Sequence, residues 1–152
     1  MKNKQLPQLL IAILFSLAIG LLSALLSGNI KTTYDMMSGS PFKVPAIVFP
    51  IVWTILYILM GISSYIIFRS DSEYKRIALG VYLLQLLLNF SYSIVTFRFG
   101  LKGLGLFITI ALLFLVLFMT LLFNKIDKKA ALLQIPYLIW LCIAILLGLF
   151  YL

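Results

Sequence analysis

Histidine is absent from this chain of 152 residues, and acidic residues are few. The four acidic side chains lie between the long apolar runs: Asp35, Asp71, Glu73 and Asp127. These absences exclude a histidine-ligated metal or haem, a Ser-His-Asp triad and an intramembrane carboxylate relay for protons. We expect no metal site and no required cofactor.

Cysteine is almost as scarce. Cys142 is the single example and lies in an apolar run, so an intramolecular disulfide is excluded. Walker-type phosphate loops and dinucleotide glycine fingerprints are also missing. Any chemistry therefore depends on Trp, Tyr, Asn, Gln, Ser and backbone groups, or on the ligand itself.

Apolar residues dominate what is present. Hydrophobic side chains make up 64% of the chain, charged ones 11%, and the mean hydropathy is +1.18. About 20 apolar residues cross a bilayer, and the charges divide the chain into pieces of that length. We predict an all-α integral membrane protein, a single five-transmembrane-helix bundle over residues 1–152. The predicted spans are 7–27, 46–68, 77–97, 104–123 and 131–151, with a long loop at 28–45.

Basic residues predict the orientation in the membrane. Five spans place eight Lys and Arg side chains on the side of the N-terminus and four on the other side. Because cytoplasmic loops are enriched in these residues, we expect a cytoplasmic N-terminus, and the helical spans favour a bacterial cytoplasmic membrane. The net charge of +8 is explained by topology and anionic lipid, so we expect the bilayer and not nucleic acid as partner.

Polar and aromatic residues form stripes within three spans. In the third span they recur at helical spacing: Tyr82, Gln85, Asn89, Tyr92 and Thr96. The second span carries the aromatic stripe Trp53, Tyr57, Gly61 and Tyr65. The fifth span carries Tyr137, Trp140 and Ala144 on one face. Such faces point inward and can line a pocket between helices. The alternatives are interhelical hydrogen bonds, close packing at the glycine and an interfacial aromatic belt.

Three ordered motifs resemble the TspO/MBR family, the tryptophan-rich sensory proteins related to the translocator protein or peripheral benzodiazepine receptor. They are P-F-x-x-P-x-x-V-F-P-x-V-W-T-x-L-Y-x-x-M-G at 41–61, L-N-F-S-Y at 88–92 and P-Y-L-I-W at 136–140. The resemblance implies a homodimer with a pocket, under the first long loop, for porphyrins, other tetrapyrroles and isoquinoline or benzodiazepine-type molecules. The expected ligand-binding residues are Tyr34, Pro45, Ile47, Trp53, Tyr57, Gln85, Asn89, Tyr92, Tyr137, Trp140 and Ala144.

The chain also departs from the family pattern. Only two tryptophans remain, and Tyr92 and Ile47 stand where many family members have Trp. Trp53 and Trp140, which resemble the tryptophans implicated in porphyrin photochemistry, are retained. The pattern therefore predicts the shape of the pocket better than the identity of the ligand.

Two functions remain open. The first is a receptor or sensor that binds a flat hydrophobic ligand, most simply a porphyrin. The second is light- and oxygen-dependent degradation of protoporphyrin, in which Trp53 and Trp140 act as catalytic residues by relaying an electron. Transport has little support, because it needs a path between two gates.

Overall fold

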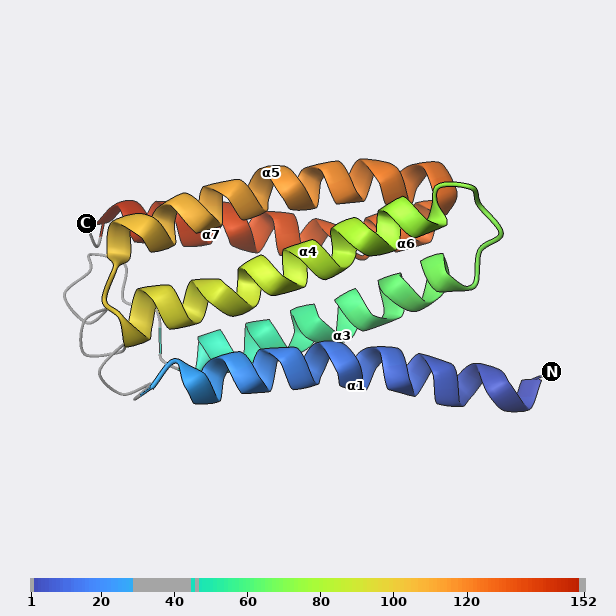
Figure 1. The fold of residues 1–152 in the computed structure, drawn as a ribbon, viewed down its shortest axis with the longest axis horizontal. Helices are drawn as coiled ribbons and strands as arrows, with labels where there is room; N and C mark the ends of the chain where they lie inside the picture. Colours follow the sequence, from blue (N-terminus) through green and yellow to red (C-terminus); the bar gives the residue numbers. More distant parts are fainter. Residues whose placement is uncertain (1, 29–44, 46, 151–152) are drawn as a thin grey trace.

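The computed structural model describes residues 2–28, 45 and 47–150, and its long helices lie side by side along one axis (Figure 1). In chain order the elements are α1 (Lys2–Leu26), α3 (Val48–Phe68), α4 (Lys75–Ser93), η1 (Ile94–Arg98), α5 (Lys102–Ile126), α6 (Lys128–Leu132) and α7 (Ile135–Phe150). No strand occurs within these described ranges. The predicted all-α bundle with five transmembrane helices is confirmed.

Five segments are long and apolar enough to cross a bilayer: Lys4–Leu26, Val48–Phe68, Lys75–Arg98, Lys102–Ile126 and Lys128–Phe150. Large apolar side chains such as Leu14, Phe107 and Phe114 are exposed on the outside of the bundle. Lipid tails solvate such side chains, whereas water does not. The molecule is therefore an integral membrane protein.

The helices differ from the predicted spans mainly at their polar ends. α1 begins at Lys2 rather than at residue 7, and α5 covers Lys102–Ile126 rather than 104–123. A terminal lysine can continue the helical backbone while its amine reaches the headgroup region. Asp127 caps the start of α6, accepting a hydrogen bond of 2.8 Å from the Lys129 amide. The fifth span then divides into α6 and α7 because Pro136 suits only the first turn of a helix.

The bundle combines two helix pairs and a helix between them. α1 packs on α3, α5 packs on α7, and α4 contacts both pairs, as Figure 1 shows. Small residues bring α1 close to α3, since a Cβ added at Gly61 would lie 2.5 Å from Ile13 Cα. Ser16 Oγ donates a hydrogen bond of 2.7 Å to the Tyr57 carbonyl. The small residues at this contact therefore serve close helix packing.

The third span ends in a π-helix. η1 follows α4 directly, and the Phe99 amide donates to the Ile94 carbonyl at 3.2 Å, five residues back. Gly100, with φ of +66°, then turns the chain toward α5. Wide π-turns are rare and frequently occur at functional sites, because they rotate the following side chains relative to an α-helix. Here the rotated residues are Thr96 and Phe97.

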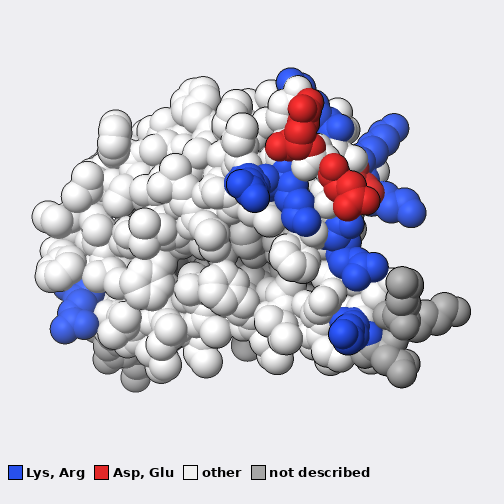
Figure 2. Space-filling view, turned by 45° about the vertical axis from the view of Figure 1, so that its right-hand side comes forward, with Lys and Arg blue, Asp and Glu red and all other residues white. Residues whose placement is uncertain are grey.

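Charged residues gather mainly at one end of the molecule, where Figure 2 shows blue and red side chains together. The described basic residues of that end are Lys4, Arg69, Lys75, Arg76, Lys125, Lys128 and Lys129. Those of the opposite end are Arg98 and Lys102. The distribution agrees with the charge asymmetry read from the sequence, and the cytoplasmic N-terminus stays a prediction.

Candidate functional site

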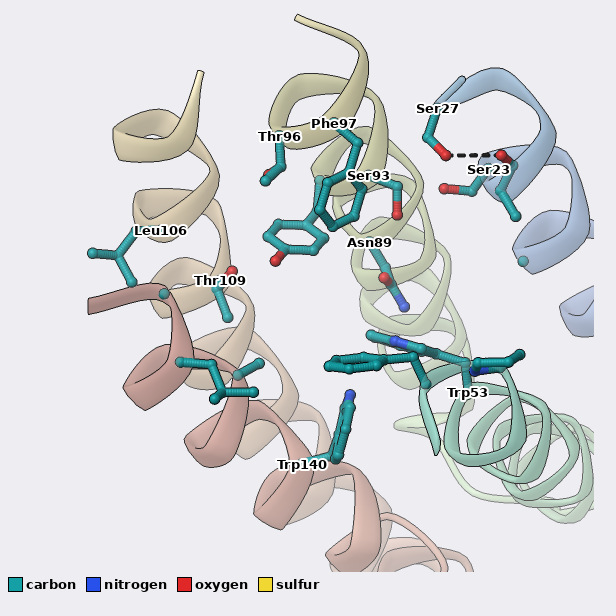
Figure 3. A pocket seen from close by; sticks show the side chains of 18 of the residues that line it. Ser23, Ser27, Trp53, Asn89, Ser93, Thr96, Phe97, Leu106, Thr109 and Trp140 are labelled. Atoms are coloured by element: carbon teal, nitrogen blue, oxygen red, sulfur yellow. Dashed lines mark hydrogen bonds between the residues drawn. The ribbon is translucent and has the colours of Figure 1, made fainter. Parts of the chain in front are cut away.

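A cavity of about 260 Å³ lies between the helices at the end of the bundle where α1 ends and α3 and α5 begin (Figure 3). All five spans contribute to its wall: α1, α3, α4 with η1, α5 and α7. Its lining is chemically uneven. Aromatic side chains come from α3 and α7, with a second aromatic pair, Tyr92 and Phe97, from α4 and η1; most of the polar groups come from α1, α4, η1 and α5.

The aromatic wall is built around two tryptophans. The ring centroids of Trp53 and Trp140 are 6.5 Å apart and their planes cross at 87°. Phe49 meets Trp140 edge to face at 5.7 Å, and Tyr57 lies beside Trp53 at 5.7 Å. Edge-to-face pairs at such distances are favourable and hold each ring in one orientation. This wall is a preformed surface for a flat apolar molecule.

Most groups of the polar wall are uncharged, and one lysine, Lys102, is the exception. Figure 3 shows Asn89 and Ser93, one helical turn apart, pointing from the third span into the cavity. Ser23 and Ser27 of α1 also line it, but their hydroxyls donate to the backbone carbonyls of Phe90 at 3.1 Å and Ala24 at 2.8 Å. Asn89, Ser93 and the Nε1–H of Trp140, which has no hydrogen-bond partner among the described residues, are therefore the polar groups best placed to meet a ligand.

Thr96 and Thr109 face each other where η1 meets α5, on the side away from Trp53 in Figure 3. Gly105 lets η1 approach α5 closely here, because a Cβ at Gly105 would overlap the Thr96 hydroxyl. Thr109 Oγ1 donates to the Gly105 carbonyl at 2.9 Å. Lys102, one turn before Leu106, is the lining residue that carries a charge. The π-helix therefore closes one side of the cavity with Thr96 and Phe97.

A chain of buried polar groups lies beneath the cavity. Asn89 Nδ2 donates to the Tyr137 hydroxyl at 3.2 Å, and that hydroxyl donates to Gln85 Oε1 at 2.9 Å. Gln85 Nε2 approaches the Met60 sulfur at 3.9 Å. Of these four residues, only Asn89 borders the cavity. Tyr137 and Gln85 support the site from below and do not reach it.

The structure divides the expected ligand-binding residues into three groups. Those that line the cavity are Trp53, Tyr57, Asn89, Tyr92, Trp140 and Ala144. Gln85 and Tyr137 lie beneath it, where they hydrogen-bond within the bundle. Pro45 and Ile47 are exposed outside the lining, because Ile47 precedes the first turn of α3 and its side chain is 65% exposed. Tyr34, like Lys31 and Lys43 of the same loop, lies outside the described residues.

Sequence reasoning missed the walls contributed by α1 and α5. The missed lining residues include Gly20, Ser23, Ser27, Lys102, Leu106 and Thr109. The signal was weak, since a lone hydroxyl in an apolar helix commonly bonds its own backbone, as Ser27 and Thr109 do. Phe97 was obscured by η1, because α-helical periodicity does not hold through a π-turn, whereas Thr96 already belonged to the polar stripe of the third span.

A five-helix membrane bundle with an aromatic-walled cavity at one end defines a class of small membrane receptors and sensors. The profile of the TspO/MBR family matches residues 12–151, and the chain belongs to that family. It is 32% identical to the tryptophan-rich protein TspO of Chlorobaculum tepidum, over 93% of this chain and 92% of that one. It is 34% identical to the tryptophan-rich protein TspO of Archaeoglobus fulgidus, over 90% of each chain. It is also 32% identical to translocator protein 2 of the dog, Canis lupus familiaris, over 72% of this chain and 66% of that one.

Proposed function

We propose that this protein is a membrane receptor or sensor that binds a flat, largely apolar ligand in the cavity, with a porphyrin or related tetrapyrrole as the first candidate. The observation that carries the proposal is the position of the tryptophans. The chain has two, and both lie on the cavity wall in an edge-to-face pair. Offset and edge contacts with a flat ring system add about 0.5–1.5 kcal/mol each beyond burial.

The volume of the cavity limits which ligands can fit inside it completely. Its volume of about 260 Å³ lies just below the range of about 300–1,000 Å³ that small-molecule pockets occupy. Two or three fused rings, as in isoquinoline or benzodiazepine-type molecules, suit this volume. A tetrapyrrole requires the helix ends to separate, or places one edge between Trp53 and Asn89 while the rest of the ring extends from the cavity.

Tryptophan fluorescence tests the proposal directly. Protoporphyrin IX added to the purified protein in detergent is expected to quench both indoles, with saturation near one ligand per chain. Trp53→Phe and Trp140→Phe keep a ring for packing, so each variant should bind with affinity reduced by less than about tenfold, or about 1.4 kcal/mol. The indole that remains in each variant should still be quenched. Absence of saturable quenching in the wild type would contradict the proposal.

Light-dependent degradation of bound protoporphyrin is the second candidate. It is favoured by the contact of both indoles with the cavity, where each can relay an electron to a light-excited porphyrin in the presence of oxygen. Illumination in air should then bleach the porphyrin absorbance faster with the wild-type protein than with either Trp→Phe variant. Equal bleaching in all three proteins would leave only the receptor function.

The proposal also covers the oligomeric state, the membrane and the orientation of the protein. We infer a homodimer in a bacterial cytoplasmic membrane with the N-terminus in the cytoplasm, supported by the family and by the basic residues gathered at one end. In a Cys142→Ala background, Ser72→Cys should react with a membrane-impermeant thiol reagent only from the cytoplasmic side. Phe99→Cys, which replaces a residue at the opposite end, should react only from outside. Labelling of both from one side would contradict the orientation.

A further inference from the structure

The direction of the hydrogen bonds beneath the cavity determines what the cavity offers a ligand. Met60 is fully buried, and its sulfur lies 3.9 Å from Gln85 Nε2. A thioether has no hydrogen to donate and acts only as a weak acceptor. Gln85 is therefore stable with its NH₂ group toward Met60 and its carbonyl oxygen toward Tyr137. The reverse orientation would place two acceptors against each other in a buried site.

The orientation of Gln85 fixes the direction of the hydrogen bonds at the next two residues, Tyr137 and Asn89. The Tyr137 hydroxyl has one hydrogen, which it donates to Gln85 Oε1 at 2.9 Å. Its oxygen then receives a hydrogen bond from Asn89 Nδ2 at 3.2 Å. All three side chains are at most 2% exposed, so water does not supply alternative partners. Neither bond uses Asn89 Oδ1.

Asn89 is the member of this chain that borders the cavity. With its NH₂ group held by Tyr137, the Asn89 side chain presents its carbonyl oxygen to the ligand. Ser93, one turn away, does not impose a direction, because a hydroxyl both donates and accepts. The wall opposite Asn89 is aromatic, with Trp53 and Trp140 in view in Figure 3. A flat molecule lying against these rings therefore meets a fixed acceptor at its edge.

We propose that Met60, Gln85 and Tyr137 are positioning residues that lock Asn89 as a hydrogen-bond acceptor, so that, among the small fused-ring ligands that the cavity can enclose, it selects those with an N–H or O–H donor at the edge that meets Asn89. The inference rests on the proposed function, since it names the ligand class of the same cavity. Ligands with only an acceptor at that edge leave Asn89 Oδ1 unpaired and facing a second acceptor. An unmade hydrogen bond of this kind costs more than a made one contributes.

Three tricyclic probes of nearly the same shape test the selection. Carbazole carries an edge N–H donor, dibenzofuran carries an oxygen acceptor at the same position, and fluorene carries neither. Calorimetric titration in one detergent should show carbazole binding about two- to tenfold more tightly than fluorene, and more tightly than dibenzofuran. Comparing ratios between variants in the same detergent cancels the partition of each probe into micelles.

Met60→Leu tests the origin of the selection at a residue that contacts no ligand. It removes the sulfur at nearly constant volume, so Gln85 loses its preferred orientation and the carbazole-to-dibenzofuran ratio should fall at least about threefold. Met119→Leu is the matched control, because Met119 is equally buried, belongs to α5 and is not one of the hydrogen-bonded residues of this chain of bonds. Asn89→Leu should abolish the preference altogether. Repeating the titrations with Ser93→Ala removes any contribution of that hydroxyl.

Each result bears on one statement. Equal binding of the three probes, or tighter binding of dibenzofuran, would overturn the selection while the receptor function stands. An unchanged ratio in Met60→Leu would overturn the role of the buried chain. If none of the probes and no porphyrin binds the wild type, the proposed function itself fails. Selection for carbazole in the wild type and Met119→Leu, reduced in Met60→Leu, is the result expected.

Discussion

The two ends of the bundle use the same helices in opposite ways. At the end near α6 the core is closed, and Ile67, Met119, Phe123 and Ala130 are fully buried. At the other end the same spans surround a cavity of about 260 Å³. All five spans run the length of the molecule, so the difference does not come from the backbone plan (Figure 1). It comes from which side chains meet at each level.

Shape complementarity explains the difference. In the closed half, branched and flexible side chains interdigitate, as in most protein cores. In the cavity half, rigid rings such as Trp53 and Trp140 line the same space as small residues such as Ala24, Ala144 and Gly148. Two edge-to-face rings cannot collapse into the space left by a missing side chain without losing their own contacts. The open end therefore persists because its large residues support one another.

Glycine has a different role at each level. A Cβ added at Gly61 would meet the backbone of α1, whereas one added at Gly20 would meet the ring of Tyr57. Backbone cannot move without separating two helices, but a ring can rotate into the neighbouring cavity. The same kind of substitution should therefore affect stability at one level and ligand binding at the other.

The largest effect is expected for Gly61→Val. The new side chain would lie 2.5 Å from Ile13 Cα, so α1 must move away from α3. We expect a loss of about 3 kcal/mol, at the upper end of overpacking costs, measured by unfolding in detergent. Gly80→Val is the control, since a Cβ at Gly80 meets nothing within 4 Å, and its stability should change by less than about 0.5 kcal/mol. Similar losses in both variants would show that helix propensity, not the contact, matters.

A smaller effect is expected for Gly20→Ala. The added methyl would lie 2.7 Å from Tyr57 Cδ2 and would displace that ring toward the cavity. Porphyrin affinity should fall about tenfold, or about 1.4 kcal/mol, while the unfolding temperature changes little. Gly148→Ala also adds a methyl at the cavity wall, but its Cβ meets only Leu106 Cδ1 at 3.1 Å. Its effect on affinity should be clearly smaller, and the reverse order would contradict the geometry.

The smallest effect is expected for Lys102→Gln. Lys102 lines the cavity and would attract the carboxylates of the proposed porphyrin ligand, but exposed ion pairs contribute only about 0–1 kcal/mol. Titrations should show at most about fivefold weaker binding at low salt, and no change at high salt. Arg98→Gln removes the same charge at the same end, where Arg98 donates to the Leu26 carbonyl outside the lining. Equal weakening in both variants would point to long-range attraction rather than to a contact at the cavity wall.

Much of the fold was predictable because its signals are local. The length and composition of each apolar run predicted a transmembrane helix, and the motifs around Trp53, Asn89 and Trp140 predicted three helices that meet. The position of Gln85 shows the limit of periodicity. It shares a helical face with Asn89, yet the cavity ends between them because Tyr137 occupies the space below. Helical periodicity predicts which face of the helix a residue lies on, but it does not predict whether the cavity extends to that level of the bundle.

The sequence by itself determined the class of this protein, because an apolar chain without intramembrane charge can satisfy its backbone in a bilayer only as helices or a closed barrel, and its spans have helical length. It also determined the chemistry available: aromatic rings, amides and hydroxyls, with no histidine. Only the tertiary structure decided where those groups meet. The hollow end, the α1 and α5 walls and the direction in which Asn89 faces depend on contacts between residues far apart in the chain, such as Asn89 with Tyr137. Such contacts leave no spacing in the sequence, because they follow from how the helices pack and not from the period of any one helix.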